Sequence, residues 1–349
     1  MNYSILEKLT IIIFTYNRHQ YLRRALDHWC NYNSKLVILD GSDKKFEDPR
    51  LEKKNIKYIY DTKGLYNRLL SSVKYIETEF MILAADDEFY LPSALCSCIN
   101  FLMKNEAYSS CGGRAIGFGL DKEKKIFGKQ VYQKLRNLTL DHESSNNRII
   151  QHFSNYVPAH FYSVIKSNKW KKICPYVFHK KYDFFGSIEL QVEFLIIISG
   201  KSKVIPELMW MRSHGVAQLV FNLPQIKIQD WWIKKKFQNE KSLFLKTLKK
   251  ASNEFTNELS VLYTEDTVTK IFETYIKENF NEKNFFIKLL LFLKIKEIKK
   301  FMFSFFKIKT KSYKNLIDEV NILESESVVV NYKDLNQIIS TVKNSITKN

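Results

Sequence analysis

The chain has 349 residues, of which 45% are hydrophobic, so it can form one large domain with an appendage or two domains. Ten glycines and six prolines exclude a low-complexity chain. A net charge of +18 suggests an anionic partner, such as a phosphorylated substrate, a nucleic acid or an acidic membrane surface, although a general surplus of surface lysine would also explain it. The odd number of cysteines and the lack of a signal peptide predict reduced thiols in a cytoplasmic protein.

The first 105 residues alternate between apolar strands and amphipathic helices. Strands are predicted at Leu9–Phe14, Leu36–Leu39, Ile56–Tyr60 and Phe80–Ala85, and helices at Asn17–Cys30, Leu65–Ile76 and Leu91–Met103. This alternation is typical of βαβ units, so it predicts an α/β fold with a mostly parallel sheet flanked by helices.

Residues 106–222 have a more mixed pattern. We expect strands at 109–118 and 161–165, a polar surface excursion at 120–150, an amphipathic helix at 187–199, and short extended pieces at 203–205 and 208–211. Gly112-Gly113 inside the first of these strands indicates the close approach of a ligand or another backbone. After residue 222 the pattern becomes helical, aromatic and rich in lysine, which predicts one domain at 1–222 and a helical, basic region at 223–349.

The acid cluster Asp86-Asp87-Glu88 is the most informative feature of the sequence. It directly follows the apolar run Phe80–Ala85, which suits a strand buried on both faces of a parallel sheet. Because isolated buried charge is very costly, the three carboxylates should lie at the carboxyl end of that strand, where open α/β sheets bind ligands. Closely spaced carboxylates there suit Mg²⁺ or Mn²⁺ shared with the phosphates of a substrate.

Two further strands also end in polar residues, at Thr15–Arg18 and at Asp40–Asp43. Parallel strands bring all three ends to one edge of the sheet, where they could together hold a nucleoside diphosphate and its metal. The simpler alternative is that strand ends are polar because the loops after them are exposed.

The segments Leu9–Arg18, Ile38–Ser42 and Leu83–Pro92 resemble the family 2 glycosyltransferases of the GT-A fold, and most closely a bacterial subgroup whose acid cluster reads Ala-Asp-Asp-Asp-Phe. The resemblance covers about residues 8–105. It implies a Rossmann-like GT-A domain, a nucleotide-sugar donor, bound Mn²⁺ or Mg²⁺, and usually inversion at the anomeric carbon. Residues 1–105 would then hold the nucleotide sugar and residues 106–222 the acceptor, a glycan or lipid-linked glycan of bacterial surface polysaccharide synthesis.

The resemblance assigns four positions to the nucleotide. Thr15, Tyr16 and Asp40 match positions that line the nucleotide pocket of the family, and Arg68 matches a basic position near the nucleotide. Asp40 would accept hydrogen bonds from the base or the ribose.

The resemblance also assigns the metal ligands. Asp86 and Glu88 match the two ends of the metal motif of the family, with Asp87 supporting them, and Glu88 replaces the usual final aspartate. His214 stands where several relatives carry a histidine near the metal and the diphosphate, although a loop histidine without a function is the simpler explanation. Arg212 could instead bind the diphosphate, because its planar guanidinium suits phosphate oxygens.

Transfer to an acceptor hydroxyl needs a general base. In the family this base is an acid about a hundred residues after the metal motif, at the start of a helix, and Glu189 matches it, with Ser187 as the helix cap. The alternative is that Glu189 only complements the helix dipole. Asp183 and Glu193 are the other candidates for the base.

The segment 284–306 predicts a basic amphipathic helix. Its apolar positions recur at spacings of three and four, and its lysines prevent it from spanning a bilayer. Such a helix either lies on an anionic membrane, which would place the protein at the inner face of the cell membrane, or packs on the catalytic domain.

Two other functions fit parts of the sequence. A nucleotidyltransferase would need a glycine-rich triphosphate loop after the first strand, but Thr15–Arg18 contains no glycine. A basic nucleic-acid-binding protein is disfavoured by the acids at the ligand edge of the sheet, so we expect no nucleic-acid partner.

Overall fold

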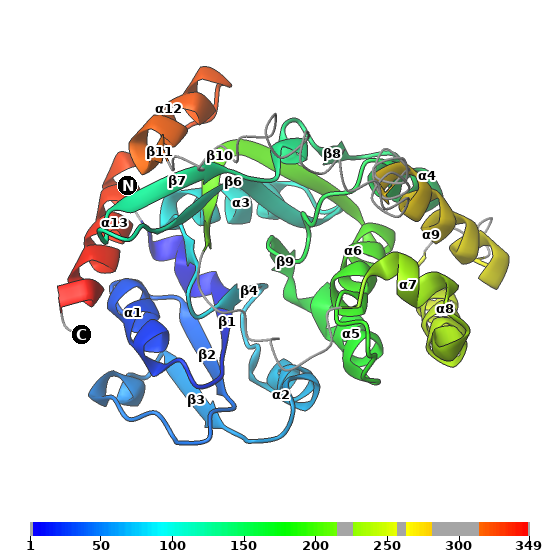
Figure 1. The fold of residues 1–349 in the computed structure, drawn as a ribbon, viewed down its shortest axis with the longest axis horizontal. Helices are drawn as coiled ribbons and strands as arrows, with labels where there is room; N and C mark the ends of the chain where they lie inside the picture. The colour runs from blue at the N-terminus through cyan, green and yellow to red at the C-terminus, as the bar shows by residue number, and fades with distance from the viewer. Residues whose placement is uncertain (1–2, 215–225, 257–262, 281–313, 348–349) are drawn as a thin grey trace, which may run out of the picture.

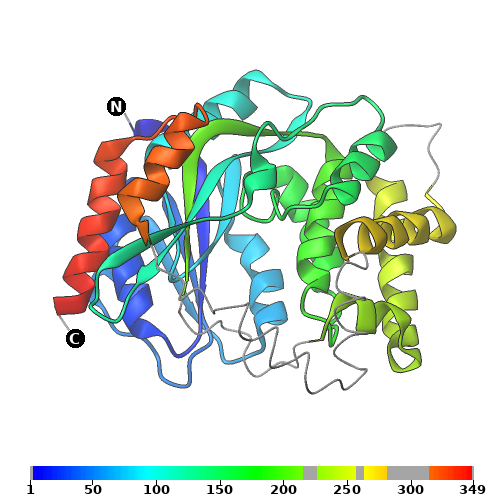
Figure 2. The same ribbon diagram turned by 45° about the horizontal axis from the view of Figure 1, so that its top comes forward.

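The computed structural model describes residues 3–214, 226–256, 263–280 and 314–347. Its centre is one mixed sheet with helices on both faces, and the N- and C-terminal ends of the chain lie on the same side of the molecule (Figures 1 and 2). This arrangement confirms the predicted α/β fold with a sheet flanked by helices.

The first half of the sheet is parallel, with strand order β3-β2-β1-β4. Its strands are β1 (Leu9–Thr15), β2 (Lys35–Asp40), β3 (Ile56–Tyr60) and β4 (Phe80–Ala85), and the helices among and after them are α1 (His19–Trp29), α2 (Leu65–Ser72) and α3 (Pro92–Lys104). Along β1, Ile11 and Ile13 join one hydrophobic cluster, whereas Ile12 joins another on the opposite face. Both faces are therefore buried, which explains why the strand is apolar without alternation.

The second half of the sheet is mixed. Its strands are β5 (Phe89–Tyr90), β6 (Tyr108–Leu120), β7 (Ile126–Gln130), β8 (Thr139–Leu140), β9 (Val164–Lys166), β10 (Lys201–Ser213) and β11 (Lys314–Asn315). β6 and β10 are parallel, whereas β9 runs antiparallel to both β4 and β6. A Cβ on Gly113 would come within 2.6 Å of the backbone oxygen of Glu207 on β10, so the glycine pair marks the approach of another backbone.

The prediction of a surface excursion at 120–150 is wrong in part. This stretch contains β7, which pairs with β6, as well as β8 and the start of α4 (Ser145–Ser154). β7 carries only two large apolar residues, Ile126 and Phe127, so its hydrophobic pattern is too short to be visible in the sequence.

The helices α5 (Ser167–Phe178), α6 (Ser187–Ser199), α7 (Ile228–Ile233), α8 (Gln238–Phe255) and α9 (Glu265–Phe280) form a layer beside the sheet (Figure 1). α6 begins and ends where the sequence predicts, but it is not amphipathic. Eleven of its residues are buried, because α4, α5 and α8 all pack against it. A helix that is apolar all round is a central helix.

The C-terminal helices α12 (Leu316–Ser325) and α13 (Tyr332–Thr347) pack on the first half of the chain, on the side of α1. Asp334 accepts hydrogen bonds of 2.5 Å from the Tyr3 hydroxyl and 2.7 Å from the backbone N–H of Ser93. The described parts of 223–349 therefore lie on two separate sides of the sheet. The predicted boundary at residue 222 and the predicted basic helix at 284–306 both lie outside the described residues.

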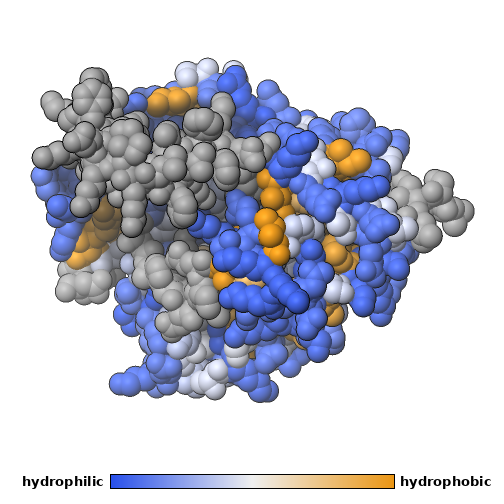
Figure 3. Space-filling view, turned by 45° about the vertical axis from the view of Figure 1, so that its right-hand side comes forward, coloured by the Kyte–Doolittle hydropathy of each residue, from blue (hydrophilic) through white to orange (hydrophobic). Residues whose placement is uncertain are grey.

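Short 3₁₀ helices complete the described chain, at Ser4–Lys8, Pro49–Glu52, Val73–Tyr75, Gln133–Leu135 and Lys235–Phe237. All five cysteines are free. Among the described residues, no helix is both long and apolar enough to span a membrane. On the face in Figure 3, hydrophilic residues predominate among the coloured atoms, and hydrophobic residues form small separate patches.

Candidate active site

The three polar strand ends meet at one edge of the sheet, as the sequence predicts. In the register of the sheet, Thr15 on β1 lies beside Asp40 on β2, and Phe14 lies beside Ala85 on β4. This is the carboxyl edge of the parallel strands, where α/β sheets bind ligands.

At this edge the three acids have different partners. Asp86 is only 1% exposed, accepts a hydrogen bond of 2.6 Å from Thr15 Oγ1 and pairs with the guanidinium of Arg18. Asp87 contacts the same guanidinium at 3.2 Å, and Glu88 accepts a hydrogen bond of 2.9 Å from the indole of Trp210. Asp86 is therefore paired inside the protein, and its role as a metal ligand stays a prediction.

The buried acid cluster resists full ionisation. Burial and the neighbouring charge of Asp87 together raise the pKa of Glu88 to about 8. Burial also raises the pKa of Asp86 to about 7, against the opposing effect of Arg18. A cation close to the acid cluster would favour the ionised form of these carboxylates.

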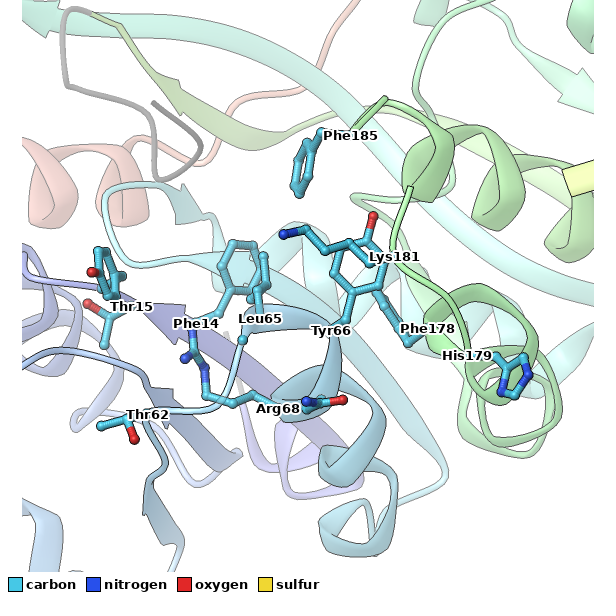
Figure 4. Close-up of a pocket in the computed structure, with 13 residues that line it drawn as sticks. Phe14, Thr15, Thr62, Leu65, Tyr66, Arg68, Phe178, His179, Lys181 and Phe185 are labelled. Carbon is cyan, nitrogen blue, oxygen red and sulfur yellow. The ribbon is translucent and has the colours of Figure 1, made fainter. Parts of the chain in front are cut away.

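A cavity of about 520 Å³, which we call the outer pocket, lies beside β1 and α2. Thr15, Tyr16 and Arg68 line it, together with Lys181 from the segment after α5 (Figure 4). The ammonium group of Lys181 points into the pocket (Figure 4). The pocket thus brings three of the four predicted nucleotide-binding residues together.

Arg68 is held at the wall of the outer pocket by backbone groups. Its Nη1 donates hydrogen bonds to the backbone oxygens of Asp61, at 3.2 Å, and Lys63, at 2.6 Å. Its guanidinium occupies the space beside Gly41, where a Cβ would come within 1.7 Å of Nη1. A side chain at position 41 would therefore displace the guanidinium of Arg68.

Asp40, the fourth predicted residue, does not line the pocket. It is fully buried, and its two carboxylate oxygens accept hydrogen bonds from the backbone N–H of Ser42, at 2.8 Å, and from the hydroxyl of Tyr58, at 2.6 Å. The backbone N–H of Asn17, a residue with a φ of 53°, donates a hydrogen bond of 2.8 Å to the hydroxyl oxygen of Ser42. In this structure, Asp40 shapes the loop after β2 and the turn that carries Tyr16.

A second cavity, of about 340 Å³, adjoins the first, and we call it the inner pocket. Phe14, Leu65 and Phe185 line both cavities, so the two form one continuous cleft. The acidic, basic and histidine side chains that line the inner pocket are those of Arg18, Asp87, Glu88, Glu189, Arg212 and His214. Asp87, Glu88, Glu189 and His214, four of the residues predicted to act in catalysis or metal binding, therefore face one cavity.

Glu189 is in the first turn of α6 and lines the inner pocket. Its Oε1 accepts a hydrogen bond of 2.7 Å from the hydroxyl of Tyr156. Burial raises the pKa of Glu189 to about 7, while the bond from Tyr156 opposes that rise. A carboxylate with a pKa near neutrality is suited to general base catalysis.

The other two candidates for the base do not line either pocket. The backbone N–H of Asp183 contacts Glu240 at the surface, and Glu193 is fully buried beside His152. Nor does Ser187 cap α6, because Gly186 is the residue before the helix and no side chain accepts a capping hydrogen bond.

Arg212 and His214 extend from the end of β10. The guanidinium of Arg212 lies 5.1 Å from the ring centre of Tyr132, and Tyr132 stacks on Trp210 at 5.1 Å. The imidazole of His214 lies where a Cβ on Gly117 would come within 2.4 Å, so this glycine allows the strand to approach the ring. Both side chains line the inner pocket.

Sequence reasoning misses four residues in or beside this cleft. Arg18 belongs to the first polar strand end but its pattern assigns it no role, and Tyr156, Lys181 and Trp210 carry no local signal. Trp210 is 122 positions from Glu88, its hydrogen-bond partner, so only the fold brings the pair together.

Residues 10–157 match the model of glycosyl transferase family 2. This stretch is similar to that family, and it spans most of β1, all of β2 to β4 and the acid cluster. No curated protein matches the chain significantly.

Solved structures show similarity at a low level. The crystal structure of S. aureus TarS 1-349 has 13% identity and a TM-score of 0.44, and the alignment covers 78% of this chain and 90% of that one. Its complex with UDP-GlcNAc has the same identity and TM-score, with 78% and 81% of the two chains covered.

Proposed function

We propose that this protein transfers a sugar from a nucleotide-sugar donor to a glycan or lipid-linked acceptor, with a divalent metal ion and Glu189 as the general base. The observation that carries the proposal is the continuous cleft, in which an outer pocket with cations adjoins an inner pocket with carboxylates.

The outer pocket suits the nucleotide end of the donor. Tyr16 and Phe178 offer apolar surface for a base, and Arg68 and Lys181 offer positive charge for phosphate. Its junction with the inner pocket, at Phe14, would place the diphosphate between the two cavities.

The inner pocket suits a Mg²⁺ or Mn²⁺ ion. Asp87 and Glu88 would supply hard carboxylate oxygens, and His214 a borderline nitrogen ligand. The raised pKa of Glu88 supports this fit, because it reflects a buried carboxylate next to another negative charge. When bound, the ion would neutralise the leaving diphosphate. Asp86 would then act indirectly, by holding Arg18 and Thr15.

Glu189 would take the proton from the acceptor hydroxyl as that oxygen attacks the anomeric carbon. It lines the same cavity as Asp87 and Glu88, so a sugar bound there would have the base and the proposed metal ligands within one cavity. A single base acting in one displacement predicts inversion. Arg212 would contribute positive charge near the same cavity.

The acceptor is expected to be an intermediate of bacterial surface polysaccharide, bound near the residues from 106 to 222. A membrane-bound lipid carrier would be reached if the segment 284–306 binds an anionic membrane as a peripheral helix.

Binding of nucleotides tests the proposal without knowledge of the sugar. UDP, GDP and CMP are added to the full chain with and without Mn²⁺, and binding is followed by thermal shift and calorimetry. We expect one of the three to bind more tightly with Mn²⁺, and Glu88→Gln to abolish the effect of the ion. Failure of all three to bind a folded protein would reject the proposal.

A further inference from the structure

His152, His160 and Glu193 form a buried cluster outside the cleft. His152 is on α4, His160 is in the loop before β9, and Glu193 is on α6. Their exposed fractions are 1%, 2% and 0%, and one potential ligand atom of each lies within 4.8 Å of the other two. Within the described ranges, this is the one group of three His, Cys, Asp or Glu side chains that comes this close together.

The cluster is ordered in advance by surrounding hydrogen bonds. Glu193 Oε1 accepts from the backbone N–H groups of His160, at 2.7 Å, and Phe161, at 2.8 Å. The Nδ1 of His160 lies 3.1 Å from the Ser110 hydroxyl, which contacts Ser202 in turn. These contacts orient the carboxylate and one imidazole, as outer partners commonly do around metal ligands.

Other nitrogen and oxygen atoms of the cluster make no hydrogen bond. Across the described chain, His152 Nδ1 and Nε2, His160 Nε2 and Glu193 Oε2 have no hydrogen-bond partner. Glu193 Oε2 lies 3.0 Å from His152 Nε2 and 3.9 Å from His160 Nε2. Neighbouring ligands of a tetrahedral zinc ion with bonds of about 2.0 Å lie about 3.3 Å apart, a value between these two distances.

Burial makes an unpaired charge in the cluster costly. Glu193 is 0% exposed, and a buried carboxylate without a cation is costly. A neutral imidazole, the form that binds metals, offers no positive charge to balance it.

We propose that His152, His160 and Glu193 bind a structural zinc-class cation, at a site separate from the metal expected in the cleft. The ion would tie α4 and α6 to the loop before β9. Glu189 lies one turn before Glu193 on α6, and Tyr156, its hydrogen-bond partner, lies one turn after His152. The site would therefore fix the position of the general base without contacting substrate.

Metal content of the purified full chain tests this proposal independently of any enzymatic activity. The double variant Asp87→Asn/Glu88→Gln removes carboxylates from the cleft. Zinc is added to the wild type and to this variant, and the excess is removed by gel filtration. We expect one equivalent of zinc to remain in the wild type and in the double variant. Cobalt(II) in its place should show the intense visible bands of a four-coordinate site.

His152→Gln, made in the same double-variant background, should lose the zinc and the cobalt bands, and His179→Gln, at an exposed histidine, is its matched control. Circular dichroism checks that each variant is folded. A folded double variant that retains no zinc, or that binds it equally well after His152→Gln, would overturn the proposal. In that case the cluster holds a proton shared between Glu193 and a histidine.

Discussion

The hydroxyl of Tyr156 donates a hydrogen bond of 2.7 Å to Oε1 of Glu189, and so joins the segment after α4 to the first turn of α6. The bond stabilises the ionised carboxylate, which the buried surroundings disfavour. Tyr156 therefore holds the proposed base in place and keeps its pKa from rising further.

The pH dependence of transfer should report the pKa of Glu189. A general base acts in its ionised form, so the rate should be low below pH 7, rise through about 7 and level off above it. In Tyr156→Phe the hydrogen bond that lowers this pKa is lost, and the rise should move to higher pH by up to about one unit. An unchanged profile, or a shift to lower pH, would contradict this role of Tyr156.

Replacing the base itself should affect turnover far more than binding. Glu189→Gln keeps the shape of the side chain but cannot accept the proton, so kcat should fall roughly 10²- to 10⁴-fold. Calorimetry should show nearly unchanged affinity for the nucleotide. Glu273→Gln, at an exposed acid on α9, is the control. Near-normal kcat in Glu189→Gln would remove this residue from the mechanism.

The two aspartates that contact Arg18 should behave differently. Asp86→Asn breaks a buried ion pair, so the free energy of unfolding should fall by roughly 3 kcal/mol, as measured by urea denaturation. Asp87 lines the cleft, so Asp87→Asn should mainly raise the Mn²⁺ concentration needed for half-maximal activity. The reverse pattern would make Asp86 the metal ligand, as the sequence motif alone predicts.

Lys181 should contribute charge to phosphate binding. It is exposed and lies at the outer pocket, so Lys181→Ala should weaken nucleoside diphosphate binding by about 1 kcal/mol, or roughly fivefold. The difference from wild type should shrink at high salt. Lys180→Ala changes a neighbouring exposed lysine that does not line the pocket, and it should have no such effect. Equal effects of the two substitutions would contradict a specific contact.

The parallel half of the fold was predictable because each buried strand is a short continuous apolar run. The same logic placed three polar strand ends on one edge, which the register of Thr15 with Asp40 confirms. The prediction that α6 is amphipathic is wrong, because the sequence does not show that other helices pack on several sides of it.

Long-range partners could not be read from the sequence. Asp40 has the residue type expected of a nucleotide ligand, yet its carboxylate accepts a hydrogen bond from the hydroxyl of Tyr58 on β3. The cluster of His152, His160 and Glu193 joins residues up to 41 positions apart, and no local pattern links them. Only the packing of α4 against α6 brings them together.

The central claim is that the cleft cleaves nucleotide sugars with the help of a metal ion. The most direct measurement is the release of nucleotide from a panel of UDP-, GDP- and CMP-sugars by the full chain, with Mn²⁺, with Mg²⁺ and with chelator. We expect release from at least one donor, dependent on the metal and lost in Asp87→Asn/Glu88→Gln. A folded wild-type chain that releases nucleotide from none of the donors, or releases it equally well in chelator, would contradict the claim.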